Sequence, residues 1–73
     1  MKKFEVHDVY ESGRAYGLDT VGAYFIAART DKFVTAIETA TKTKKRLKIK
    51  VYDGIEFFMF DPISVVRADR QVG

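Results

Sequence analysis

Residues 46–60 read Arg-Leu-Lys-Ile-Lys-Val-Tyr-Asp-Gly-Ile-Glu-Phe-Phe-Met-Phe, with a β-rich run on either side of Asp53-Gly54. Asp-Gly readily adopts the positive φ angles of a two-residue type I′ turn. The stretch therefore predicts a β-hairpin, and the turn sets which residues lie opposite one another. The expected pairs are Tyr52 with Ile55, Val51 with Glu56, Lys50 with Phe57, Ile49 with Phe58, Lys48 with Met59 and Leu47 with Phe60.

This register divides the hairpin into two faces, because successive residues of a strand point to opposite sides. The face expected in the core holds Leu47, Ile49, Val51, Phe58 and Phe60, with Glu56 at its rim near the turn. The other face, which we call the basic–aromatic face, holds Lys48, Lys50, Tyr52, Ile55, Phe57 and Met59. This mixture of lysines with aromatic and aliphatic side chains is typical neither of a hydrophobic core nor of a surface that contacts only solvent. These six residues are therefore the predicted partner-binding site.

Size and composition indicate one small globular domain over residues 1–73. Hydrophobic residues make up 47% and charged residues 32%, which argues against a disordered chain. The absence of cysteine excludes disulfides and thiolate metal sites and favours a reducing compartment. The segment after Met1 is too polar for a signal peptide, and no apolar run approaches the roughly 20 residues of a membrane span. We expect a soluble cytoplasmic protein that does not enter a membrane.

Outside the hairpin, the pattern predicts several further elements. Alternating β-formers predict a strand over 4–10, and the glycine-rich residues 11–22 are expected to form a long loop. Residues 23–29 are apolar on both faces, as in an inner strand. Pro62 cannot donate a ladder hydrogen bond and should end the hairpin. A short strand over 63–68 and a flexible tail over 69–73 would complete the chain.

Residues 31–42 are ambiguous between helix and strand. Their threonines, with Val34 and Ile37, favour a strand by propensity. At about 100° per residue, however, the apolar residues gather on one side of a helix and the polar residues on the other. Thr30 or Asp31 would cap its N-terminus, and Glu38 and Lys42 would form an i,i+4 pair. We therefore predict a helix.

The resulting fold class is α+β, with one helix packed on a small, mainly antiparallel sheet. The alternative is an all-β barrel. A two-residue hairpin followed by Asp61-Pro62 and a short strand is similar in pattern to SH3-like barrels, among other small regulatory β proteins. This resemblance is one of pattern only and assigns no functional residue.

No arrangement of residues points to catalysis. The single histidine, His7, has Asp8 beside it, but adjacent strand residues point to opposite faces and do not form a pair. Residues 13–17 lack the phosphate-loop pattern and a following helix. No recognised metal-ligand spacing occurs. We expect a non-enzymatic protein with no catalytic residues, cofactor or metal.

The partner is expected to meet the basic–aromatic face. One helix covers only one side of the sheet, and an apolar patch left on the other side is uncommon on a stable monomer. We therefore predict a protein-interaction or regulatory module that forms homo-oligomers or docks on another protein. The alternative is a single-stranded nucleic-acid-binding protein, because this face and the cations of 42–50 could stack bases and neutralise phosphates. A closed barrel that buries both faces would make the six residues ordinary core.

Overall fold

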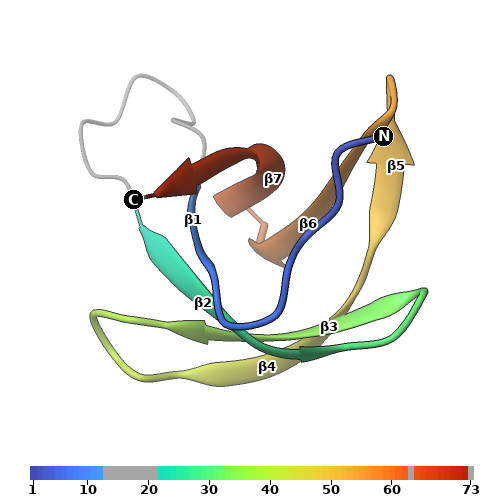
Figure 1. The fold of residues 1–73 in the computed structure, drawn as a ribbon. Coiled ribbons are helices and arrows are strands. Elements are labelled where there is room, and N and C mark those ends of the chain that lie inside the picture. Colours follow the sequence, from blue (N-terminus) through green and yellow to red (C-terminus); the bar gives the residue numbers. More distant parts are fainter. Residues whose placement is uncertain (13–21, 63, 73) are drawn as a thin grey trace.

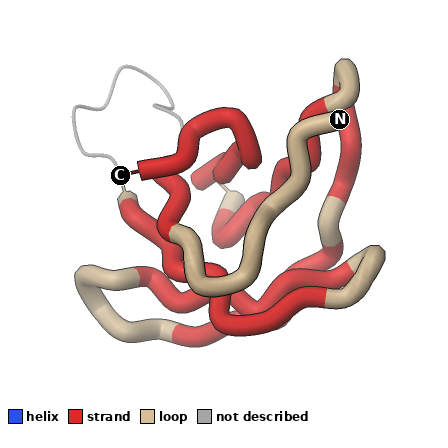
Figure 2. Tube along the Cα trace, viewed as in Figure 1, coloured by secondary structure: helices blue, strands red, loops and turns tan. Residues whose placement is uncertain are grey.

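The computed structural model describes residues 1–12, 22–62 and 64–72, which form seven β-strands and no helix (Figure 2). The strands are β1 (Val9–Ser12), β2 (Ala23–Arg29), β3 (Phe33–Glu38), β4 (Lys44–Lys48), β5 (Lys50–Tyr52), β6 (Ile55–Asp61) and β7 (Ser64–Val72). They form one sheet in the order β4-β3-β2-β1-β7-β6-β5, and each neighbouring pair is antiparallel. The α+β prediction is therefore wrong, and the all-β barrel that was the alternative fits.

The sheet curls into a nearly closed barrel, because its two edge strands are consecutive in the chain (Figure 1). β4 pairs with β3, the chain bends at Ile49, and β5 then pairs with β6. The bend brings β4 against the far end of β6. There the Lys45 ammonium donates a 3.0 Å hydrogen bond to the Phe60 carbonyl and lies 4.6 Å from the centre of the Phe60 ring. A side chain thus spans the gap between β4 and β6.

The predicted helix over 31–42 is instead the strand β3 and the turn after it. β3 lies between β2 and β4, and its inward side chains Val34 and Ala36 are fully buried. Its outward residues Phe33, Thr35 and Ile37 are half-buried. The helical pattern failed because a short segment with apolar residues on both strand faces also fills one side of a helix. Pairing with two neighbouring strands then decided in favour of the β-propensity of threonine, valine and isoleucine.

The hairpin turn is confirmed. Asp53 and Gly54 have φ angles of 54° and 73°, and the pairs Tyr52–Ile55, Val51–Glu56 and Lys50–Phe57 form as expected. The three further pairs do not form, because the Ile49 N–H donates to the Lys32 carbonyl at 2.7 Å. The residues before Ile49 therefore pair with β3, as strand β4, and not with β6. The hairpin is therefore shorter than the sequence suggested.

Other boundaries also differ from the expectation. β2 spans the predicted 23–29, and β6 ends at Asp61 before Pro62. The first strand begins only at Val9, and Glu11 and Ser12 belong to it and not to a loop. Most of that loop, residues 13–21, lies outside the described residues. The tail expected over 69–73 is wrong as far as Val72, because β7 continues to this residue and pairs it with Val9.

The N-terminal residues lie beside the hairpin instead of forming a strand of their own. Lys2 bridges to Ile55 in parallel orientation, and the Lys2 N–H donates to the Gly54 carbonyl at 2.8 Å. The Glu56 N–H donates back to the Lys2 carbonyl at 2.9 Å. The segment thus occupies the side of β6 that β7 leaves open near the turn (Figure 1).

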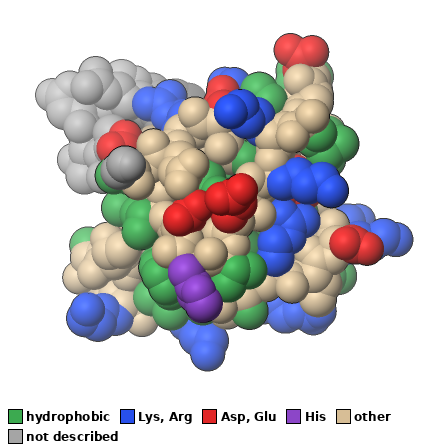
Figure 3. Space-filling model, viewed as in Figure 1, with side chains coloured by type: hydrophobic (Ala, Val, Ile, Leu, Met, Phe, Trp, Pro, Cys, Tyr) green, Lys and Arg blue, Asp and Glu red, His purple; other side chains and the backbone are tan. Residues whose placement is uncertain are grey.

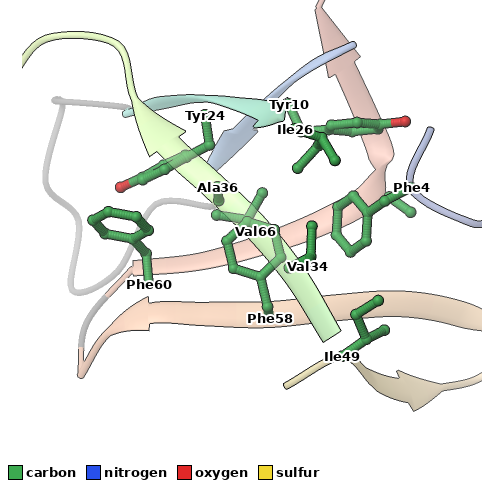
Figure 4. Packing of buried hydrophobic residues seen from close by; sticks show 11 residues of the cluster. Phe4, Tyr10, Tyr24, Ile26, Val34, Ala36, Ile49, Phe58, Phe60 and Val66 are labelled. Atoms are coloured by element: carbon green, nitrogen blue, oxygen red, sulfur yellow. The ribbon is translucent and has the colours of Figure 1, made fainter. Parts of the chain in front are cut away.

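Aromatic side chains fill most of the barrel interior (Figure 4). Phe4 packs edge-on against Tyr10 with ring centres 4.8 Å apart, and it also contacts Phe58 at 5.0 Å. Tyr24 contacts Phe60 at 4.7 Å. The remaining buried hydrophobic residues are Ile26, Val34, Ala36, Ile49, Val66 and Ala68. With five aromatic rings in contact, a small barrel buries enough apolar surface to hold together.

The predicted core face of the hairpin is correct for Ile49, Phe58 and Phe60, which are buried, and Leu47 packs against them while partly exposed. Two of its members differ. Val51 lies at the hairpin tip, beyond the barrel, and is 52% exposed. Glu56 was placed at a rim but is buried, because Arg29 of β2 reaches over to pair with its carboxylate.

Candidate binding face on strands β5 to β7

A hollow of about 370 Å³ lies on the outer side of the barrel over β5, β6 and β7. It is lined by Tyr52, Asp53, Ile55, Phe57, Val65 and Arg67. The turn at Asp53-Gly54 sets the position of Tyr52 and Ile55, and the β6–β7 pairing adds the residues of the last strand. The hollow thus has an apolar floor with charged groups at its sides.

A row across three strands gives the hollow its chemical character. Phe57 of β6 lies opposite Lys50 of β5 on one side and opposite Arg67 of β7 on the other. The Phe57 side chain is half-buried, whereas Lys50 and Arg67 are exposed. Since neighbouring strands are about 4.8 Å apart, a lysine and an arginine begin at backbone positions directly beside that of the phenylalanine, one on either side. We call these three residues the Lys50–Phe57–Arg67 row.

The structure brings together most of the predicted site. Tyr52, Ile55 and Phe57 line the hollow, Lys50 stands in the row, and Met59 lies next along β6, opposite Val65. The barrel does not bury this face in its core, since Tyr52 is 78% and Met59 is 39% exposed.

Lys48 does not join the hollow. It lies in β4, opposite Phe33, because the hairpin ends at the bend.

Sequence reasoning missed three lining residues: Asp53, which it had assigned only to the turn, and Val65 and Arg67 of β7. The short connection between Asp61 and Ser64 was a signal that β7 returns alongside β6. The register shifts between Met59 and Asp61, however, and such an irregularity reverses which side chains face outward. The sequence contains no marker of this shift, so the face of β7 could not be assigned.

The charge of Arg67 is partly balanced within the strand. Its guanidinium forms a 2.7 Å ion pair with Asp69, and both side chains remain partly exposed, at 46% and 30%. An exposed pair of this kind is worth little and exchanges readily for another anion. Arg67 is therefore able to contact an anionic group that enters the hollow.

The described residues contain no cluster of side chains suited to metal binding. Groups of three or more side chains able to hold a metal ion do not occur within residues 1–12, 22–62 and 64–72. His7 is exposed and stacks on the Phe25 ring at 6.0 Å, and Figure 3 shows it surrounded by hydrophobic side chains. The same described ranges include no helix long and apolar enough to cross a membrane.

Comparison of the chain with protein-family models, curated proteins and solved structures found no match. The functional argument therefore rests on the hollow and its surroundings alone.

Proposed function

We propose that the protein binds single-stranded nucleic acid, with the bases in the hollow and the phosphates on the cations around it. The observation that carries the proposal is the Lys50–Phe57–Arg67 row. An accessible ring offers a stacking surface to any base, and cations beside it neutralise the backbone. Tyr52 supplies a second ring whose exposed fraction, 78%, is unusual for an aromatic residue without a partner.

The net charge of the chain is positive, as expected for a protein that binds the negatively charged nucleic-acid backbone. The chain carries a formal charge of +3 and a pI near 9.3, a modest excess that suits weak, salt-sensitive binding. The proposed activity is binding without a chemical step and without a cofactor. A cytoplasmic location follows as part of the proposal, because a chain without cysteine has no need of an oxidising compartment.

The test is fluorescence anisotropy with a labelled oligo(dT) of about twelve nucleotides, in the size range that small β-barrels bind. The wild type should bind it more tightly than a duplex of equal length, whose bases are already stacked. Tyr52→Ala should weaken binding by about tenfold, because stacking on an aromatic ring contributes roughly 1–3 kcal/mol per base. Val51→Ala is the matched control, since Val51 is also exposed but points to the other face.

Two results would contradict the proposal. One is the absence of oligonucleotide binding by the wild type at low salt. The other is equal affinity of Tyr52→Ala and Val51→Ala, which would leave the hollow without a role.

Contact with protein, including a second copy of this chain, is the other candidate function. Met59, beside the hollow, and Val65, which lines it, form an outward apolar pair. The aliphatic stems of lysine and arginine can lie flat over such an apolar surface. Light scattering of nuclease-treated protein tests this candidate. A dimer that Met59→Ser converts to monomer would favour it, whereas a monomer at all concentrations would exclude self-association through this face.

A further inference from the structure

One continuous segment, residues 44–52, leads from the far edge of the barrel to the hollow (Figure 1). Its outward side chains are Lys44, Arg46, Lys48, Lys50 and Tyr52, all exposed. Its inward side chains Leu47 and Ile49 pack against the core. The bend at Ile49 therefore interrupts the pairing of the segment but not its alternation of faces. We call Lys44, Arg46, Lys48 and Lys50 the cation track.

On the described strands, no carboxylate residue is paired with a member of the cation track. The residues opposite its members on the neighbouring strands are Ile37, Thr35, Phe33 and Phe57, which are all uncharged. The sequence from 42 to 50 also contains no acid. The four charges therefore reinforce one another and form an uninterrupted basic strip on the surface.

One member of the track is held in place. The Arg46 guanidinium lies 4.2 Å from the centre of the Phe33 ring, within the range of a cation–π contact. A guanidinium stacked in this way keeps its donors at its edges free for phosphate oxygens. Binding there would cost less side-chain entropy than binding to a freely rotating lysine.

We propose that the cation track carries the sugar–phosphate backbone of the single strand to the hollow. The inference rests on the proposed function and extends it by naming the path and length of the ligand. From Lys44 to Tyr52 an extended segment covers on the order of 25 Å, at about 3.3 Å per residue. A strand that keeps the rise of about 3.4 Å per nucleotide of a stacked helix would span it with roughly seven or eight nucleotides. Shorter oligonucleotides would occupy only the hollow.

The more ordinary explanation of these lysines is protection of a sheet edge. Natural proteins place lysine on short edge strands to prevent pairing with other chains. Under that explanation, removing the charges would promote self-association and leave oligonucleotide affinity unchanged.

The test compares Lys44→Gln/Lys48→Gln with the control Lys3→Gln/Arg70→Gln, which removes the same charge from exposed positions outside the track. Among the described residues, the side chains of Lys44 and Lys48 form no hydrogen bond or ion pair, so circular dichroism should show both variants folded. Anisotropy with labelled oligo(dT) of about four, eight and sixteen nucleotides then gives affinity and its salt dependence.

For the eight-nucleotide ligand we expect the track variant to bind about tenfold more weakly than the control at roughly 0.2 M salt, with a salt slope flatter by about 1.4, or 0.7 per lost contact. For the four-nucleotide ligand the two variants should agree. In the wild type, affinity should rise up to about eight nucleotides and then level off.

Equal affinities of the two variants for the longer ligands would overturn the track while leaving the hollow as a binding site. A track variant that self-associates but still binds as the control does would also overturn it, in favour of edge protection. Absence of binding by the wild type would remove both the track and the proposed function.

Discussion

The guanidinium of Arg29, at the end of β2, forms a bidentate ion pair with the carboxylate of Glu56 on β6. Nη1 lies 2.7 Å from Oε1, and Nη2 lies 3.0 Å from Oε2. The same pair holds Phe4, whose N–H donates to Oε1 at 2.8 Å and whose carbonyl accepts from Nη1 at 2.7 Å. The Arg29 and Glu56 side chains are only 16% and 4% exposed. One ion pair thus joins two strands and the N-terminal segment.

Glu56→Gln should lower the free energy of unfolding by about 3 kcal/mol, because removing one partner leaves the buried Arg29 charge without compensation. Asp69→Asn is the matched control, since it breaks the exposed ion pair with Arg67 and should cost about 1 kcal/mol or less. Urea unfolding followed by circular dichroism gives both values. Similar small losses would mean that the Arg29–Glu56 pair is not needed for stability.

Stability should also fall in mild acid. Burial alone would raise the pKa of Glu56, but hydrogen bonds from Arg29 and the Phe4 N–H outweigh it and hold the pKa below its ordinary value of 4.5. Between the two pKa values the unfolded chain binds more protons, so stability rises with pH there. The contribution of Glu56 is complete above about pH 4.5 and is lost as the pH falls through the folded value. Melting temperatures from pH 7 to 2 should show this decline, and Glu56→Gln should reduce it.

Gly54→Val should destabilise the fold by roughly 1–2 kcal/mol, since a β-branched residue resists positive φ. A side chain at position 54 would meet nothing within 4 Å, so the cost is conformational and not a clash. Gly54→Asn should cost clearly less, because asparagine tolerates this region. Equal melting temperatures of the two variants and the parent would contradict the assigned turn.

Lys45→Ala should cost about 1 kcal/mol, because it removes a cation–π contact and a hydrogen bond that span the gap between β4 and β6. The adjacent Lys44→Ala should be close to neutral, since Lys44 points outward. Thermal unfolding of the two variants compares them at equal net charge. If Lys44→Ala were the more damaging change, the barrel would not be closed through Lys45.

Local chemistry was enough to locate several elements. Asp53-Gly54 identified the turn because few residues adopt positive φ without strain, and the register followed for the three residue pairs nearest the turn. Pro62 marked the end of β6. Five of the six predicted site residues (Tyr52, Ile55, Phe57, Lys50 and Met59) then lie in or beside the hollow.

Contacts between distant residues decided the rest. A segment such as 33–38 satisfies helix and strand patterns alike, and only the strands on both sides select one of them. The bend at Ile49 depends on a hydrogen bond to Lys32, and burial of Glu56 depends on Arg29, 27 residues away. The sequence by itself determined the turn, the hairpin tip and an outward basic and aromatic face, because each depends on neighbouring residues. Tertiary structure decided the closure of the barrel, the point at which the hairpin ends and the position of Arg67 beside Phe57. The reason is that backbone groups pair with whichever strand the closing sheet places next to them.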